Sequence, residues 1–254
     1  KKLGEKTKIP VFLKLTGILI FTGLTGHGSW QSIESDSISQ ILDIIQKNEF
    51  IAPLASSNIS LTTPPLYSFV AAGFAKIFMF ILPIHDGARL SNALWASITL
   101  ISIGLATREL WGIGFGRQAG LLFIASIGLI LNIHSLIPDI ATLSGLSLCF
   151  YSLTLYYRRP FRSSVLMGSG LGITFLSGGL IPLISIVVTS IILYAFKFWR
   201  NNRYLTFIGL SFGIGIVIIS PWVISMNYLH PQLFSDWLNQ QIFIRRPTFL
   251  YTLS

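Results

Sequence analysis

The chain is a succession of apolar segments, most of them 17 to 23 residues long, separated by short polar or basic stretches. About 20 apolar residues in a helix cross the hydrocarbon core of a bilayer, and a helix satisfies its own backbone hydrogen bonds there. Only 11% of the residues are charged and the mean hydropathy is +0.70, whereas about a quarter of the residues in a soluble domain are charged. The sequence therefore predicts an all-α integral membrane protein.

The charges between the apolar segments decide how many of them span. Residues 66–82 are long enough to cross, but Lys76 interrupts them and their apolar residues recur at helical spacing. If this segment lies on the outer surface, thirteen basic residues face the cytoplasm and five face outside, as the positive-inside rule requires. The rule thus favours a cytoplasmic N-terminus and about seven transmembrane helices, over residues 9–25, 90–106, 119–136, 140–157, 163–176, 180–196 and 204–226. It also accounts for the net charge of +9 without a nucleic-acid partner.

Residues 26–89 form the one long polar interval, and five of the nine carboxylates lie in it. Ser32 suits an N-cap, Glu34 and Asp36 follow in the first turn, and apolar residues then repeat at helical spacing as far as Ile45. We expect two amphipathic surface helices in this outer loop, the second over residues 66–82. The whole chain, 1–254, then forms a single transmembrane module with a further outer segment at 227–254, and a C-terminal part is expected beyond it.

The candidate catalytic residues are the carboxylates of the predicted outer face. Asp139 follows Pro138 at the outer end of the third span, on the same face as Glu34 and Asp36. Carboxylates placed together could bind a divalent metal ion or act as a general base. Capping of the next helix explains Asp139 equally well.

Two further patterns suggest a binding site and a packing contact. Arg245 and Arg246 lie on the predicted outer side beside aromatic residues, where paired guanidinium groups suit either a bound phosphate or ordinary lipid headgroups. Gly168, Gly170 and Gly172 fall within the fifth span and are expected to allow close helix packing.

The order of several short motifs resembles the GT-C membrane glycosyltransferases, in the branch of protein O-mannosyltransferases and bacterial lipid A aminoarabinose transferases. That resemblance covers nearly the whole chain. The matching stretches are Glu34, residues 44–53, Thr63-Pro64-Pro65-Leu66-Tyr67, Ala88-Arg89-Leu90, Pro138-Asp139, Leu176-Ser177-Gly178-Gly179-Leu180, and Ser220-Pro221-Trp222 followed by Arg245-Arg246.

The resemblance implies an enzyme that moves a sugar from a polyprenyl-phosphate donor to a lipid or protein acceptor on the outer face of the membrane. Glu34 or Asp36 would be the base or a ligand of a divalent metal ion, and Asp139 would support it. Arg245 or Arg246 would hold the donor phosphate. The expected location is the bacterial inner membrane, with the lipid bilayer and the polyprenyl-linked sugar as partners.

Three positions depart from the family pattern. Ile33 stands where the family has the first of two adjacent acidic residues, and Thr63 and Gly178 replace lysines. These departures support an alternative, in which the chain is a catalytically silent GT-C-like subunit or scaffold of a larger membrane complex.

Overall fold

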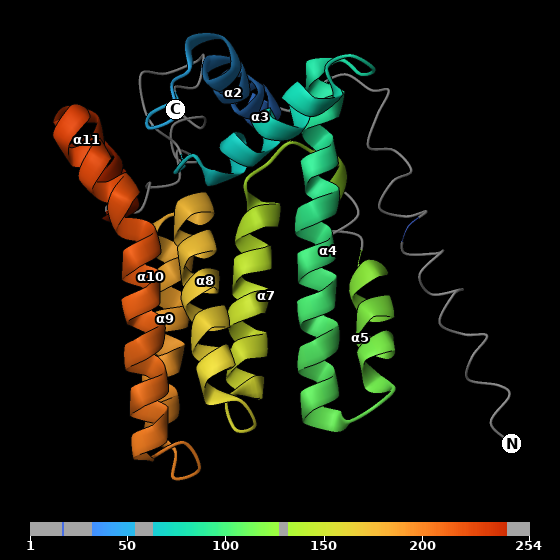
Figure 1. Ribbon diagram of the computed structural model, residues 1–254, viewed down its shortest axis with the longest axis vertical. Coiled ribbons are helices and arrows are strands. Elements are labelled where there is room, and N and C mark those ends of the chain that lie inside the picture. Colours follow the sequence, from blue (N-terminus) through green and yellow to red (C-terminus); the bar gives the residue numbers. More distant parts are fainter. Residues whose placement is uncertain (1–16, 18–31, 54–62, 127–131, 243–254) are drawn as a thin grey trace, which may run out of the picture.

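The computed structural model describes residue 17 and residues 32–53, 63–126 and 132–242, and in these ranges it contains helices and no strand. Two layers are visible in Figure 1, a bundle of long helices and a group of shorter helices across one end of it. The predicted span at residues 9–25, apart from residue 17, and the paired Arg245 and Arg246 lie outside the described ranges.

The bundle helices run alternately up and down beside one another, as short connections between consecutive helices require. They are α4 (Ile84–Trp111), α5 (Phe115–Ile124), α7 (Asp139–Leu155), α8 (Pro160–Gly178), α9 (Leu180–Ala195) and α10 (Asn202–Leu229). Helices α4 and α10, at 28 residues each, are long and apolar enough to cross a membrane, and α7 and α9 are shorter apolar helices. Outward-facing residues of the bundle include exposed Ile101, Leu122 and Val217, as expected for a membrane protein. The count of seven spans stays a prediction.

The end of the bundle that carries the predicted outer loop is covered by α2 (Ser32–Leu42), the single π-helical turn η1 (Asp43–Lys47) and α3 (Leu66–Phe78). Helix α11 (Pro231–Ile242) leaves α10 at the same end (Figure 1). Helices α2 and α3 occupy the two segments that the sequence predicted as surface helices, although α3 ends at Phe78 rather than at residue 82.

Two predicted helix boundaries were wrong. Helix α4 begins at Ile84, directly after Pro83, and so takes in polar residues that the sequence placed in the outer loop. A continuous helix over residues 119–136 is not formed, because α5 ends at Ile124 and the Ser126 hydroxyl donates to the Phe123 carbonyl at 2.7 Å. That bond satisfies a carbonyl in the last turn of the helix.

Glycines bring the central helices into close contact, as predicted for α8. A Cβ on Gly170 would lie 2.6 Å from the Cys149 sulfur of α7, and one on Gly168 would lie 2.6 Å from Ile214 of α10. Gly172 meets α10 in the same way, at Ile218. Helix α8 therefore packs closely against both α7 and α10 through its glycines.

The two ends of the bundle carry opposite charge. At the end with α2 and α3, the described residues include seven carboxylates and three basic side chains. At the other end, the connections after α4, α7 and α9, taken with the helix turns on either side of them, hold eight basic residues and Glu109 as the one carboxylate among the described residues. These three connections therefore lie at one end of the bundle, and their cytoplasmic location stays a prediction.

Candidate functional site

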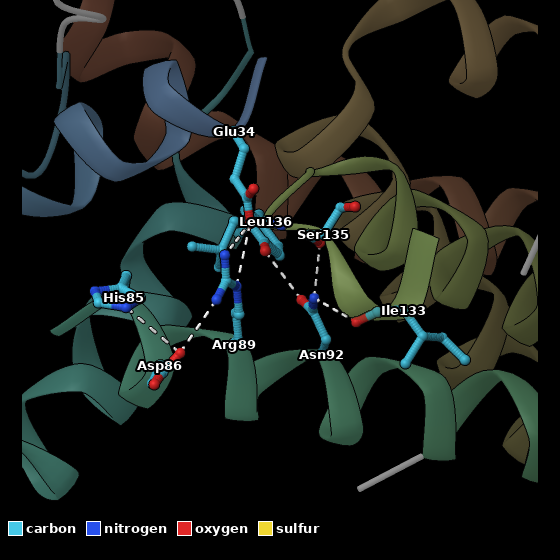
Figure 2. A network of polar contacts seen from close by, with 9 residues as sticks. Glu34, His85, Asp86, Arg89, Asn92, Ile133, Ser135 and Leu136 are labelled. Carbon is cyan, nitrogen blue, oxygen red and sulfur yellow. Dashed lines mark hydrogen bonds and ion pairs between the residues drawn. The ribbon is translucent and has the colours of Figure 1, made fainter. Parts of the chain in front are cut away.

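A buried cluster of charged side chains joins α2 to the start of α4 (Figure 2). Arg89 is fully buried, and Glu34 and Asp86 are 1% and 5% exposed. The Arg89 guanidinium donates to Glu34 Oε1 from Nε at 3.1 Å and from Nη2 at 2.8 Å, and to Asp86 Oδ1 from Nη1 at 3.1 Å. A buried guanidinium must be matched by acceptors in this way, because an unpaired charge is strongly destabilising in a low-dielectric interior.

The same Glu34 oxygen also accepts a hydrogen bond from the backbone of the chain that precedes α7. The Leu136 N–H donates to Glu34 Oε1 at 3.1 Å. On the other side of the cluster, His85 Nε2 lies 3.6 Å from Asp86 Oδ1. Glu34 thus connects three separate parts of the sequence, namely α2, α4 and the segment before α7.

A second buried contact from α4 fixes that segment, residues 133–138, which we call the strap. The Asn92 side-chain amide donates to the Ile133 and Ser135 carbonyls at 2.8 Å each (Figure 2). Its carbonyl oxygen accepts from the Tyr67 hydroxyl of α3 at 2.9 Å. Burial, and next the negative charge of Glu34, raise the pKa of Tyr67 well above its usual range, so this hydroxyl remains a neutral donor.

The strap delivers Asp139 to the first position of α7. The N-cap is Pro138 and no side-chain capping bond is made there, so the interpretation of Asp139 as a helix cap was wrong. Asp139 is exposed, and a carboxylate in the first turn interacts favourably with the helix dipole. Its side chain is therefore available to a ligand, unlike the side chain of Glu34.

Asp139 borders a pocket of about 360 Å³ between the end of α5 and the start of α7. Its polar lining is Ser126, Asn132, Thr142 and Asp139, and its apolar lining is Phe123, Ile140, Leu143 and Leu146. A few convergent polar groups beside an apolar wall are typical of sites for amphipathic small molecules.

The remaining predicted site residues do not all meet here. Asp36 lies on α2, half-buried and with a partner, whereas Arg245 and Arg246 lie outside the described ranges. In the part of the chain that the structure describes, no three His, Cys, Asp or Glu side chains come together as a metal ligand set. The divalent metal ion stays a prediction.

Two of the departures from the family pattern have clear positions in the fold. Gly178 ends α8 against α7, and a Cβ there would lie 2.6 Å from the Thr142 side chain and 2.8 Å from Pro182. A lysine would not fit at this position unless its neighbours moved. Thr63 is half-buried just before Pro64 and Pro65, which are both buried.

Sequence reasoning assigned no role to Asp86, Arg89 or Asn92. Their spacing could have revealed them. Three polar residues at successive intervals of three lie on one face of a helix that is otherwise largely apolar. Ionisable residues within such a helix usually face the protein interior and pair with each other. That pattern would have predicted a buried polar contact with the first outer loop.

Comparison with solved structures identifies the fold. No protein family model and no curated protein sequence matches the chain. The crystal structure of ArnT from Cupriavidus metallidurans bound to undecaprenyl phosphate superposes with a TM-score of 0.81 at 16% identity, over 94% of this chain and 45% of ArnT. The apo structure of the same protein gives a TM-score of 0.78 at 17% identity, over 94% of this chain and 44% of ArnT.

The chain thus spans less than half of the length of the structures it resembles. ArnT is a lipid A aminoarabinose transferase of the GT-C superfamily. The chain therefore has an all-helical, ArnT-like fold, which agrees with the predicted GT-C-like architecture, and at this level of identity the likeness concerns the fold alone.

Proposed function

We propose that this chain carries the acceptor-activating part of a membrane glycosyltransferase that takes a sugar from a polyprenyl-phosphate donor. The observation that carries the proposal is the exposed Asp139 carboxylate beside a pocket of about 360 Å³, in a fold shared with a protein that binds undecaprenyl phosphate. The pocket is lined by the first turns of α7, which begins at the end of the bundle where α2 and α3 lie. There a lipid tail can stay in the bilayer while its phosphate and sugar reach water.

The carboxylates suit different tasks. A general base must reach the proton that it removes, and Asp139 is exposed whereas Glu34 is 1% exposed and accepts three hydrogen bonds on one oxygen. We therefore assign the base to Asp139 and a positioning role to Glu34, which holds the strap that leads into Asp139. Asp36, on the same helix as Glu34, would assist from the outer loop.

In the proposed step, an acceptor hydroxyl oxygen forms a bond to the anomeric carbon of the donor sugar. The bond between that carbon and the phosphate oxygen breaks, and the electron pair leaves with the polyprenyl phosphate. The hydroxyl proton passes to the Asp139 carboxylate. Arg245 or Arg246 would stabilise the departing phosphate by charge-assisted hydrogen bonds.

The polar wall of the pocket supports an acceptor hydroxyl next to this base. Asn132 and Ser126 supply an amide and a hydroxyl to the same pocket lining as Asp139, and the rest of that lining is mostly apolar. The proposed step uses the protein's own side chains and the donor. The acceptor would be a lipid or protein on the outer face of a bacterial inner membrane.

Asp139→Asn tests the proposal. Loss of a general base lowers the rate by about 10² to 10⁴-fold, and we expect a decrease in this range with little change in helix content. The measurement is transfer of radiolabelled sugar from a panel of undecaprenyl-phosphate donors in membranes that contain the protein, with circular dichroism of the purified variant.

Asp236→Asn is the matched control. Asp236 is an exposed carboxylate on α11, at the same end of the bundle but away from the pocket lining. We expect it to transfer sugar at the wild-type rate. Wild-type transfer by Asp139→Asn would contradict the assignment of the base and, if Asp36→Asn were also fully active, the proposed function itself.

A further inference from the structure

The end of the bundle opposite Asp139 carries a dense set of cations that the proposed reaction does not use. Six basic residues lie in two connections, each taken to include the first turn of the helix that follows it: residues 156–162 between α7 and α8, and residues 196–203 between α9 and α10. Together we call them the basic platform. They are Arg158, Arg159, Arg162, Lys197, Arg200 and Arg203, and all six are exposed. Neither connection contains an acidic residue.

Two tyrosines fasten these connections to each other. The Tyr157 hydroxyl donates to the Phe198 carbonyl at 2.7 Å, and the Tyr156 hydroxyl donates to Asn201 Oδ1 at 2.8 Å. Asn201 Oδ1 also accepts from the Tyr204 N–H at 2.8 Å and so caps α10. The cations of the two connections are therefore held on a common rigid base.

Aromatic rings of the two connections also pack against one another. The ring of Tyr157 is 4.9 Å from Phe198 and 5.5 Å from Trp199, and the ring of Tyr156 is 5.9 Å from Trp199. Phe198 is 70% exposed. Tyrosine and tryptophan side chains favour the boundary between the hydrocarbon and the headgroups, so the platform lies at headgroup depth.

The platform is poorly neutralised by the protein. Glu109 of α4 pairs with Arg158 at 2.5 Å, and in the described part of the chain no carboxylate pairs with the other five cations. Each basic residue near a membrane surface adds to the attraction for anionic lipid, and basic sites between helices suit headgroups with more than one charge. Two cationic connections held side by side match two linked phosphates.

From these contacts we infer that the basic platform binds an anionic phospholipid whose headgroup carries two phosphates, as in a cardiolipin, with one phosphate toward each connection. This inference is independent of the proposed glycosyl transfer, because it concerns the opposite end of the bundle. The general excess of basic residues on one side of a membrane protein predicts attraction to any anionic lipid. Because the two connections are held together by hydrogen bonds, we expect a preference for the lipid whose headgroup carries two phosphates.

Native mass spectrometry of the purified chain in one detergent tests the inference. Tetraacyl cardiolipin, phosphatidylglycerol and phosphatidylcholine are added separately, and inorganic phosphate is added as a competitor. We expect cardiolipin to bind at least tenfold more tightly than phosphatidylglycerol, and inorganic phosphate at millimolar concentration to leave it bound. Equal affinity for the two anionic lipids, or displacement by inorganic phosphate, would overturn the inference.

Three double variants that remove the same charge locate the site. Arg159→Gln with Arg162→Gln and Arg200→Gln with Arg203→Gln each remove two cations from one connection, and each should weaken cardiolipin binding at least tenfold. Arg108→Gln with Arg117→Gln removes two cations from α4 and α5 at the same end, outside the platform. This variant should change the affinity for cardiolipin less than twofold. Equal losses in all three would show diffuse attraction and refute a defined site.

Two more variants separate binding from folding. Arg159→Lys with Arg162→Lys keeps the charges and should retain most of the binding, and wild-type helix content by circular dichroism confirms that the glutamine variants fold. Tyr157→Phe keeps every cation but removes the bond to Phe198. It should reduce the preference for cardiolipin over phosphatidylglycerol, and an unchanged preference would contradict the two-connection geometry.

Discussion

At the scale of single residues, one guanidinium determines how the first outer loop meets the bundle. Arg89 lies between Glu34 and Asp86, and Glu34 in turn accepts from the Leu136 backbone. The surface helix α2, the long helix α4 and the strap therefore share one buried charge centre. Loss of a single member removes a charge partner from the others in a low-dielectric environment, which is more damaging than the absence of the whole group.

This asymmetry gives a stability prediction for Arg89. Arg89→Met leaves two buried carboxylates without their cation and should lower the free energy of unfolding by about 3 to 5 kcal/mol. Glu34→Gln keeps the Asp86 contact and should lower it by about 1 to 3 kcal/mol. Denaturant titration in detergent micelles, followed by circular dichroism, measures both values.

The double variant Glu34→Gln with Arg89→Met should be less destabilised than the sum of the two single variants, because the two positions share one interaction. Asp43→Asn is the control, since Asp43 pairs with Lys47 at 2.7 Å where the lysine is 70% exposed. An exposed pair of this kind contributes about 0.3 to 0.5 kcal/mol. Additive effects at Glu34 and Arg89 would contradict a coupled centre.

At the scale of helices, the crossing of α7 and α8 places the start of α7. A Cβ on Gly145 of α7 would lie 2.7 Å from the Thr174 nitrogen and 2.9 Å from the Gly170 carbonyl oxygen of α8. Both contacts are with backbone atoms, which cannot rotate away as a side-chain terminus can. The two helices must separate if Gly145 gains a side chain, and Asp139 at the first position of α7 moves with them.

Gly145→Ala should therefore lower the free energy of unfolding by about 1 to 3 kcal/mol, as overpacking does, and also lower sugar transfer. Gly209→Ala on α10 is the matched control, because a Cβ at that position would meet no atom within 4 Å. An alanine there should raise stability slightly, by about 0.5 to 1 kcal/mol, through helix propensity. Thermal unfolding in detergent compares the two variants, and equal effects would argue against a close crossing.

At the scale of the whole molecule, the separation of charge between the two ends gives an orientation. The end with eight basic residues should face the cytoplasm, and the end with seven described carboxylates should face outside. The native Cys149 is buried between α7 and α8, so it gives little background in cysteine-labelling experiments.

Asp236→Cys and Arg203→Cys test this orientation with a membrane-impermeant maleimide. In spheroplasts, the cysteine at position 236 should react at once, and the one at position 203 should react only after the membrane is permeabilised. Wild-type protein, with Cys149 alone, serves as the control and should stay unlabelled. The opposite pattern would invert the topology and place Asp139 in the cytoplasm.

The sequence by itself determined the class of the fold, because long apolar segments leave the backbone only helices in a bilayer. It also placed the three basic connections on one face and identified α8 as a closely packed helix through its glycines. These features depend on composition and spacing along the chain. The physical requirement behind each of them acts locally, so it can be read from a single segment.

Only the tertiary structure decided which carboxylate is exposed and can reach a bound ligand. The periodicity of α2 predicted a helix with an apolar stripe, but the face that it buries carries Glu34, Ser37 and Gln40 beside Ile41. The partners of that face, Arg89 and Ser68, lie 55 and 28 residues away. Burial of a charge depends on such distant partners, and for this reason the sequence could propose Glu34 and Asp139 together but not tell the buried one from the exposed one.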